Sequence, residues 1–553
     1  MNTGTIVDAA AAGDPARAAI IVDGRSINYG ELLQAVRHCA AGLVAHGVTA
    51  GQRVAVVDTG SLLSIATVLG AARVGAAAAL MNPALTAPEL RALVKNAGCA
   101  DVAVAGEAYA DGVADAGVST VLTAADLTTG SSSGPATDSA VDTDDDRDAL
   151  ILFTSGTTGL PKAVAIAGRQ LTLRIKGMAA PFRAHAKPSV SMLSVPFFHV
   201  GGALAVLGSV YSGNTVVVQR RFDAGEWLHL ASQHRVSTTF MVPTMLQRII
   251  DHPDFATTDL TSLVAIAYGA AAAPIALVRR AMAALPHVGL ANVFGQTETL
   301  GAYTTLMPDD HRDPARAGSV GRPLPGVDVR VVDPETGDDV EPGTVGELWV
   351  NTTQNVSEGW LRTGDLGRLD SDGYIFPSGR LTDTINRGGE KFGPIEVEEA
   401  LRSHPAVGDA AVAGIVDEEL GQRVGAAVVA VAPVTLDELR SHCRDLIAYF
   451  KMPERLAIVD QIPYTETGKV NRRRLATLIV DSARIQKSQR SIGAVSSRNP
   501  QGGGYAARRI RGRLPRRVDA DPGQAGHRPA ALVHQPRARI CSRLQRGDHH
   551  GHR

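Results

Sequence analysis

The sequence predicts an α/β protein with more than one domain. Residues 20–127 alternate short apolar runs such as RVAVVDTG with alanine-rich helical stretches such as ELLQAVRHCAAGLVAHG. This alternation is typical of parallel strands covered by helices. A chain of 553 residues also exceeds what one hydrophobic core usually organises. With 44% hydrophobic and 20% charged residues, the composition is that of an ordinary globular protein, and a single small module is excluded.

Three features argue against a membrane-spanning or disulfide-stabilised protein. The most apolar run, SLLSIATVLGAARVGAAAAL, is interrupted by Arg73, so no membrane span is predicted. The first residues carry no cationic segment ahead of an apolar stretch, and the cysteines form no CxxC pair. We therefore expect a cytoplasmic protein without a disulfide framework or a cysteine-rich zinc site.

Residues 486–553 form a basic tail that differs from the rest of the chain. They contain fourteen Arg and one Lys against three Asp, a net charge of +12, which leaves −13 for residues 1–485. The segment has almost no aliphatic periodicity, so it is predicted to be disordered. Basic arms can bind nucleic acid, but no aromatic residue interleaves the arginines after Tyr505, and a tail without a chemical role is the favoured interpretation.

Residues 128–148 are small and polar and are predicted to be a surface linker. The strand sequence ALILF comes next, and a loop that can hold phosphate follows it. Its sequence is TSGTTGLPK. Glycines allow close backbone approach, hydroxyls and amides donate to phosphate oxygens, and lysine adds charge. The spacing is not that of a GxxxxGK[ST] P-loop, and the alternative is a plain surface turn. The candidate phosphate-binding residues are Thr154, Ser155, Gly156, Thr157, Thr158, Gly159 and Lys162.

Further strings follow in order along the chain: IAYGAAAAPI, VFGQTET, WLRTGDLG, GRLTDTINRGGEKFGPIEVEEAL and PYTETGKVNRRRL. Together with TSGTTGLPK, they resemble the successive core motifs of the AMP-forming acyl-adenylate synthetases. This superfamily includes acyl-CoA synthetases, peptide-synthetase adenylation domains and luciferases. The resemblance covers roughly residues 15 to 480, and the basic tail falls outside it.

The resemblance implies a domain organisation. We expect a large multi-sheet α/β domain over residues 1–381 and a small, mobile α+β domain over residues 383–482, with the active site at their interface. Thr382 and Asp383 are the expected hinge. Relatives usually carry Asp or Lys where this chain has Thr382, so the pivot residue itself departs from the family pattern.

The resemblance also implies an ATP site with Mg²⁺. Glu298 matches the carboxylate associated with the metal, and Thr297 supplies a hydroxyl near the α-phosphate. Asp365 is expected to accept from the ribose hydroxyls, and Arg380 to bind ribose and phosphate oxygens. The remaining expected contacts with the nucleotide are Gly269, Ala270, Phe294 and Gly295.

Lys469 is the expected catalytic lysine, on a loop that covers the active site during adenylation. Its ammonium can neutralise charge between the carboxylate and the α-phosphate in the transition state. The alternative is an ordinary loop lysine before the basic run NRRR.

The acid is expected to lie beside His199, Val200, Gly201 and Tyr268. A core histidine beside phenylalanines is the alternative for His199. Because Gly201, Gly202 and Ala203 are small, they are predicted to leave space at the wall of this pocket.

The acceptor is predicted from the glycine-rich string RGGEK. Gly388 and Gly389 allow close approach of a pantetheine thiol, and Arg387 and Lys391 can meet the anionic end of CoA. The alternative is a tight turn before a helix. The resemblance therefore implies conversion of a carboxylic acid to acyl-AMP and then to acyl-CoA, and for this chain we expect the acid to be a short- to medium-chain fatty acid. An oxalate or aryl-acid CoA ligase, and an enzyme that loads an acyl carrier protein, remain alternatives.

Overall fold

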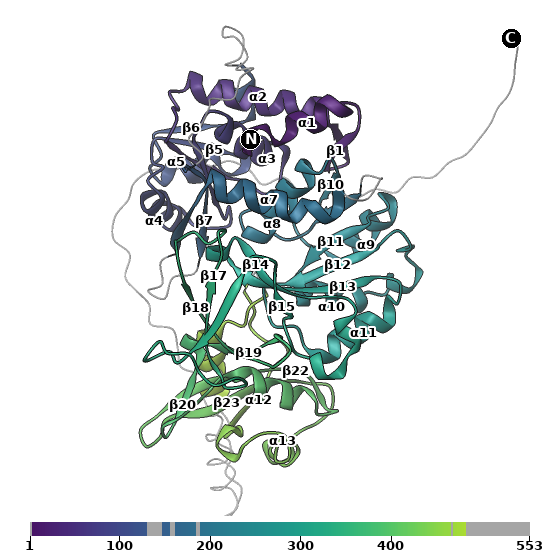
Figure 1. Ribbon diagram of the computed structural model, residues 1–553, viewed down its shortest axis with the longest axis vertical. Helices are drawn as coiled ribbons and strands as arrows, with labels where there is room; N and C mark the ends of the chain where they lie inside the picture. Colours follow the sequence, from purple (N-terminus) through teal and green to yellow (C-terminus); the bar gives the residue numbers. More distant parts are fainter. Residues whose placement is uncertain (1–2, 130–145, 155–160, 184–188, 466–467, 483–553) are drawn as a thin grey trace, which may run out of the picture. The chain divides into compact units, whose positions relative to one another are not determined.

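The computed structural model describes residues 3–129, 146–154, 161–183, 189–465 and 468–482 (Figure 1). The centre of the predicted linker, residues 155–160 of the phosphate loop and the basic tail lie outside the described residues. The α/β prediction is confirmed, because two large sheets that are mostly parallel are joined by helices.

The larger sheet has nine described strands in the order β15-β14-β13-β12-β11-β9-β10-β1-β2. Its inner strands are parallel, and the outer pairs at both edges are antiparallel. The bounds are β1 (Ala18–Val22), β2 (Arg25–Asn28), β9 (Val190–Leu193), β10 (Thr215–Val218), β11 (Thr238–Met241), β12 (Ala265–Gly269), β13 (Gly289–Gln296), β14 (Gly301–Leu306) and β15 (Arg322–Pro323).

A second sheet has the order β6-β5-β3-β4-β7-β8 among the described strands. Every residue of β4 is buried, as expected for a strand with parallel neighbours and helices on both faces. The bounds are β3 (Arg53–Val57), β4 (Ala77–Met81), β5 (Val102–Ala105), β6 (Thr120–Leu122), β7 (Asp148–Thr154) and β8 (Lys162–Ala167).

Helices connect the two sheets through one hydrophobic core. α3 covers β3 and β4 and packs against α2, while α7 lies on β7 and β8 and packs against α8, which covers β9 and β10 (Figure 1). α2 begins with a reciprocal cap, because the Asn28 side chain accepts from Glu31 N and the Glu31 carboxylate accepts from Asn28 N, each at 2.8 Å. The helices of this part are α1 (Ile6–Gly13), α2 (Tyr29–Ala45), α3 (Leu62–Arg73), α4 (Ala87–Ala97), α5 (Ala110–Asp115), α6 (Ala124–Thr129), α7 (Gly168–Arg183), α8 (Val200–Tyr211), α9 (Ala224–Gln233), α10 (Pro243–Ile250) and α11 (Ile275–Ala284).

A four-stranded antiparallel sheet follows, in the order β16-β17-β18-β19. Its bounds are β16 (Asp328–Val332), β17 (Gly346–Asn351), β18 (Leu361–Leu369) and β19 (Ile375–Arg380). In the register of β18 and β19, Asp365 is paired with Arg380. Two predicted nucleotide-binding residues that are separate in sequence therefore become neighbours.

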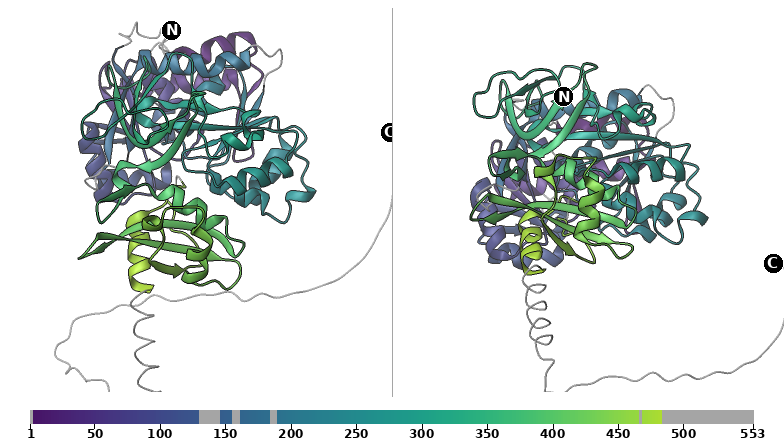
Figure 2. Two further views of the ribbon diagram at one scale, coloured as in Figure 1. Left: turned by 60° about the horizontal axis from the view of Figure 1, so that its bottom comes forward. Right: turned by 90° about the horizontal axis from the view of Figure 1, so that it is seen from below.

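The remaining described residues form a small α+β unit around the long antiparallel hairpin of β22 (Val407–Asp417) and β23 (Gly421–Ala430). Alternate residues of β22 face two apolar clusters: Ala410 and Val412 pack with α12 and α13, and Ala411 and Ala413 pack with helical residues 472–482, yellow in Figure 2. The other elements are β20 (Ile385–Arg387), β21 (Glu390–Phe392), α12 (Pro394–Arg402), α13 (Leu436–Cys443) and β24 (Arg455–Ile458).

The stretch with the most apolar sequence forms α3 and β4 rather than one continuous helix. Arg73, the residue that interrupts it, is buried and pairs with Asp8 at 3.0 Å. Within the described ranges, no helix has the length and apolar character needed to cross a bilayer.

Candidate active site

A pocket of about 250 Å³ brings together motif residues from both parts of the chain. Its walls come from the ends of β12 and β13, from β18 and β19, from α11 and α12, and from the segment that carries Lys469. Nine of the predicted site and hinge residues line it: Tyr268, Gly269, Ala270, Phe294, Gly295, Asp365, Arg380, Asp383 and Lys469.

The first wall is the carboxyl edge of parallel strands β12 and β13. Gly269 is required there, because a Cβ on it would lie 2.1 Å from the carbonyl oxygen of Val293 on the neighbouring strand. Ala270 follows with a φ of 66°, a left-handed backbone that is strained for a residue with a side chain. The sheet edge therefore presents close-packed backbone to the pocket, as a nucleotide-binding surface needs.

Glu298 lies on the tight connection between β13 and β14. The turn is closed by Gln296 N, which donates to Thr299 Oγ1 at 3.1 Å, and it ends in left-handed backbone at Leu300 and Gly301. Thr154 Oγ1, at the end of β7, lies 3.5 Å from Glu298 Oε1. Two motifs from different sheets therefore meet, and Thr297 precedes Glu298 in the same turn.

Asp365 and Arg380 form an ion pair across β18 and β19, with Arg380 Nε 2.9 Å from Asp365 Oδ1. The Asp365 side chain is 8% exposed, and the backbone N of Asp365 donates to Thr363 Oγ1 at 3.0 Å. Burial raises the pKa of Asp365, and the positive charges of Arg380 and Lys469 oppose that rise. Asp365 is thus a buried acceptor whose ionised form depends on two cations.

Lys469 lies on a turn between Tyr464 and Val470. Thr465 N donates to the Lys469 carbonyl at 2.8 Å, Lys469 N donates to Thr465 Oγ1 at 3.2 Å, and Gly468 has a φ of 73°. The Lys469 residue is exposed as a whole, but desolvation of its ammonium group and the charge of Arg380 lower its pKa. The charges of Asp365, Glu298 and Asp383 act in the opposite direction. The first two are the carboxylates that the resemblance assigns to the ribose and to the metal.

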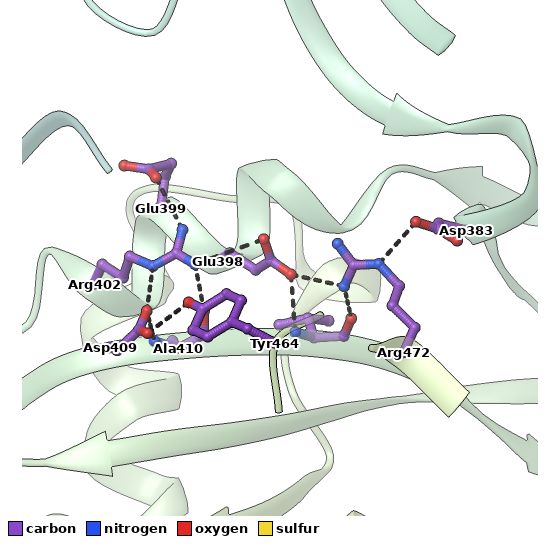
Figure 3. A network of polar contacts seen from close by, with 9 residues as sticks. Asp383, Glu398, Glu399, Arg402, Asp409, Ala410, Tyr464 and Arg472 are labelled. Atoms are coloured by element: carbon purple, nitrogen blue, oxygen red, sulfur yellow. Dashed lines mark hydrogen bonds and ion pairs between the residues drawn. The ribbon is translucent and has the colours of Figure 1, made fainter. Parts of the chain in front are cut away.

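A network of ion pairs anchors both ends of the segment that carries Lys469 (Figure 3). Tyr464 donates to Asp409 Oδ2 at 2.6 Å, and Asp409 also receives Arg402 Nε at 3.0 Å. On the other side, Arg472 contacts Glu398 at 2.8 Å and Asp383 at 2.9 Å.

Sequence analysis missed this network, because a basic residue in the run NRRR resembles an ordinary surface side chain. One feature of the sequence does point to Arg472: it lies three residues before Leu475, so in a helix the two share a face, and Leu475 is fully buried. A residue there lies close to the core of the small unit. Arg472 also links that core to Asp383, one of the two predicted hinge residues.

His199 is the N-cap residue of α8, and its ring stacks at a tilt on Phe198 with 4.6 Å between centroids. Its Nε2 is buried and has no hydrogen-bond partner among the described residues. Burial, together with the charge of Lys469, lowers the pKa of His199 to about 4. His199 is therefore neutral at neutral pH. Its Nε2 has no hydrogen-bond partner among the described residues, and the charge of Lys469 acts on the ring.

The predicted open space at Gly201 and Gly202 is wrong. A Cβ on Gly201 would lie 2.7 Å from Cε1 of Phe240, and one on Gly202 would lie 2.2 Å from the Pro196 carbonyl oxygen. The two glycines permit close packing at the start of α8, so they do not widen a pocket. Tyr268, by contrast, lines the pocket and is hydrogen-bonded through its hydroxyl to His311 Nε2 at 2.8 Å.

The predicted CoA loop forms the hairpin of β20 and β21, with left-handed backbone at Gly388 and Gly389. Both of its cations are paired: Arg387 Nε lies 2.5 Å from Glu454, and Lys391 Nζ lies 2.7 Å from Glu335. None of the four predicted CoA-binding residues, Arg387, Gly388, Gly389 and Lys391, lines the pocket described above. Their role toward CoA stays a prediction.

Several predicted residues lie away from the pocket or outside the described chain. Lys162 is paired with Thr154 in the register of β7 and β8, and Val200 begins α8. Ser155, Gly156, Thr157, Thr158 and Gly159 are outside the described residues, as is the tail 486–553. Within the part of the chain that the structure describes, no group of three or more His, Cys, Asp or Glu could hold a metal ion. A single carboxylate is nevertheless sufficient for Mg²⁺ when substrate phosphates complete its coordination.

The fold and the pocket define a nucleotide-dependent enzyme, and comparison with known proteins gives its class. The family model "AMP-binding enzyme" matches residues 7–361, and the model "AMP-binding enzyme C-terminal domain" matches residues 396–469. The chain therefore belongs to the AMP-binding enzyme family, the AMP-forming acyl-adenylate synthetases.

Its relatives differ in the acid and in the acceptor that their names state. The fatty acid–[acyl-carrier-protein] ligase ScoC of Streptomyces coeruleorubidus is 30% identical, over 84% of this chain and 93% of the relative. A feruloyl-CoA synthase of an Amycolatopsis species is 32% identical, over 82% and 94%. The o-succinylbenzoate CoA synthetase MenE of Bacillus subtilis, solved with ATP and magnesium, aligns with a TM-score of 0.74 at 26% identity, over 85% of this chain and 99% of that structure.

Proposed function

We propose that this protein is an ATP-dependent acid–thiol ligase that converts a short- to medium-chain carboxylic acid to its CoA thioester. The observation that carries the proposal is that Asp365, Arg380 and Lys469 line one pocket, and that the charge of Glu298 acts on both Asp365 and Lys469. Adenylation brings two anions together, so it needs cations and positioned carboxylates in this arrangement.

In the first half-reaction, a carboxylate oxygen of the acid attacks the α-phosphorus of ATP, and the bond to pyrophosphate breaks. Lys469 neutralises charge on the attacking carboxylate and the α-phosphate, Asp365 accepts from the ribose hydroxyls, and Arg380 binds ribose and phosphate oxygens. Mg²⁺, when bound at Glu298, offsets charge on the phosphates. Thr154 and Thr297 supply hydroxyls beside that carboxylate.

In the second half-reaction, the CoA thiol attacks the acyl carbonyl of the mixed anhydride, its proton is released, and AMP leaves. The small unit turns about Thr382 and Asp383 between the two steps, which withdraws Lys469 and brings the Gly388–Gly389 turn to the pocket. The hairpin geometry supports this role, because left-handed glycines allow a thiol to approach the backbone.

A carrier-protein acceptor is the second candidate, favoured by the likeness to a fatty acid–[acyl-carrier-protein] ligase. One assay separates the two. Pyrophosphate release is followed with short, medium, long and aryl acids, with and without CoA, and the thioester product is identified by mass spectrometry. We expect acyl-CoA with free CoA alone. Acyl-AMP that accumulates until a phosphopantetheinylated carrier protein is added would favour the second candidate, and no pyrophosphate release with any acid would contradict both.

A further inference from the structure

Tyr268 and His311 form a hydrogen-bonded pair in the wall of the pocket. Tyr268, on β12, is 2% exposed, and its hydroxyl lies 2.8 Å from His311 Nε2. The two rings meet edge to face, with 5.8 Å between their centroids. His311 stands in the short turn after β14, and its Nδ1 lies 2.7 Å from the Met307 carbonyl oxygen. The tyrosine hydroxyl is thus one end of a chain of hydrogen bonds that begins at a backbone carbonyl.

The Met307 carbonyl sets the direction of both hydrogen bonds. A carbonyl oxygen can only accept, so His311 Nδ1 is the donor. Burial lowers the pKa of His311, which keeps the ring neutral at neutral pH. A neutral imidazole with its proton on Nδ1 has a bare Nε2, so Nε2 accepts from the Tyr268 hydroxyl. Because the hydroxyl proton is used in this bond, the Tyr268 oxygen can offer only lone pairs to a ligand.

The neighbours of Tyr268 in the pocket are residues that the sequence places beside the nucleotide. Of the four described residues expected beside the acid, Tyr268 lines the pocket, and His199, Val200 and Gly201 do not. By contrast, the pocket contains all four remaining expected contacts with the nucleotide: Gly269, Ala270, Phe294 and Gly295. The company that Tyr268 keeps therefore favours a contact with the nucleotide over a contact with the acid.

Two neighbouring strands place Tyr268 on the face of the sheet that carries Phe294. Tyr268 of β12 is paired with Asn292 of β13, and Phe294 lies two residues further along β13, so the three side chains share one face. All three line the pocket, together with the aliphatic side chains of Val278 and Met282 from α11. An aromatic ring and aliphatic walls suit a planar base, and Tyr268 and Asn292 supply polar groups for its edge.

We infer that the Tyr268–His311 pair selects the base of the nucleotide: the Tyr268 oxygen accepts from the amino group at position 6 of adenine and disfavours a purine with a carbonyl oxygen there. The inference rests on the proposed function. Tyr268 contacts the base, and His311 is a positioning residue that acts through Tyr268. Asn292 cannot make this distinction alone, because a side-chain amide can present either its donor or its acceptor. A fixed acceptor does discriminate, since the wrong base leaves it unpaired.

The test compares ATP with inosine triphosphate (ITP), which carries a carbonyl oxygen in place of the 6-amino group. Pyrophosphate release is measured with each nucleotide and a saturating concentration of the acid that the wild type uses best. We expect the wild type to prefer ATP. Tyr268→Phe removes the acceptor, so we expect the ATP-to-ITP ratio of kcat/KM to fall by about 10- to 100-fold, chiefly through KM for ATP. KM for the acid should not change.

His311→Leu gives a result that a merely structural role would not give. Without the imidazole, the Tyr268 hydroxyl can turn its proton toward the pocket and donate to the carbonyl oxygen of ITP. We therefore expect kcat/KM for ITP to rise by about 3- to 10-fold while kcat/KM for ATP falls. His311→Gln should keep part of the ATP preference, because its amide oxygen can accept from the hydroxyl. In the Tyr268→Phe background, His311→Leu should change the ratio no further.

Tyr29→Phe is the matched control, because it removes a buried hydroxyl outside the pocket that donates to the Asn214 carbonyl at 2.7 Å. It should leave the ratio unchanged. Equal use of ATP and ITP by the wild type, an unchanged ratio in Tyr268→Phe, or equal losses for both nucleotides in His311→Leu would overturn this inference and leave the proposed function standing. Absence of pyrophosphate release with all acids would overturn the proposed function, and this inference with it.

Discussion

The two sides of the pocket hold their functional groups in different ways. On the side of the large sheets, Asp365 is buried within β18, and Gly269 and Gly295 stand in strands whose neighbours leave no room for a Cβ. On the other side, Lys469 is exposed on a turn held by a few hydrogen bonds, and it depends on Tyr464 and Arg472 at its ends.

The difference indicates which group is fixed and which can leave. A group built into a sheet has its position set by many backbone hydrogen bonds, so it keeps one geometry through a catalytic cycle. A group on an anchored turn can be withdrawn as a unit without unfolding its surroundings. We therefore expect substitutions on the two sides to separate the two half-reactions.

The largest effect is expected from Lys469→Ala. Loss of the one charge placed between carboxylate and α-phosphate should lower acyl-AMP formation by more than about 100-fold. Thioester formation from supplied acyl-AMP should survive, because that step does not need the lysine. Arg473→Ala, an exposed neighbour, is the control. Equal losses in both half-reactions would contradict the comparison.

Asp365→Asn should affect both half-reactions, because the nucleotide stays bound in each. An amide accepts more weakly from the ribose hydroxyls and leaves Arg380 without its ion pair, so we expect KM for ATP to rise by about 10- to 100-fold. Asp372→Asn, on an exposed turn after the same strand, should leave KM for ATP unchanged. A change confined to kcat of the first step would argue against binding of the ribose.

Two glycines on α8 compare a tightly packed position with one that has room for a methyl group. Gly201→Ala places a methyl group 2.7 Å from the Phe240 ring, whereas the nearest atom to a Cβ on Gly208 is Met178 Cε at 4.0 Å. We expect Gly201→Ala to lower the free energy of unfolding by about 1–3 kcal/mol and Gly208→Ala to raise it by about 0.5–1 kcal/mol. Thermal unfolding of the two variants checks this, and equal shifts would show that the Phe240 ring moves freely.

The last effect is a change in the pH dependence of stability, and it concerns His199, whose pKa is shifted partly by the charge of Lys469. His199, with its pKa lowered to about 4, stays neutral in the folded protein while an unfolded histidine protonates near pH 6.5. Unfolding therefore takes up a proton as the pH falls from 6.5 toward 4, and stability declines across that window.

His199→Asn removes this titration and keeps a residue that caps helices well. Between pH 8 and pH 5 we expect the variant to lose about 2 kcal/mol less stability than the wild type, as measured by urea unfolding at both pH values. The exposed His229→Asn is the matched control. An identical pH dependence in the wild type and in His199→Asn would show that His199 is accessible to protons in the folded state.

The sequence could predict the class of fold and the residues that line the pocket, because motif strings fix which side chains stand at strand ends. It could not predict what each residue touches. The pairing of Asp365 with Arg380 depends on the register of β18 and β19. The open space expected at Gly201 was wrong because Phe240, a residue from a distant strand, fills it. Arg472 carried no local signal of its ion pairs with Glu398 and Asp383, since these are decided by tertiary packing.

Arg472 has a consequence for the cost of turning the small unit. Of its two carboxylate partners, Glu398 on α12 of the small unit is 3% exposed, whereas Asp383, a predicted hinge residue, is 32% exposed. Leaving a buried partner is expensive, but an ion pair near water can be exchanged for hydration at little cost. Arg472 is therefore expected to keep its buried pair with Glu398 and to exchange its more exposed pair with Asp383 for water. In the proposed rotation, only the pair with Asp383 would have to open, and the buried pair with Glu398 would stay intact.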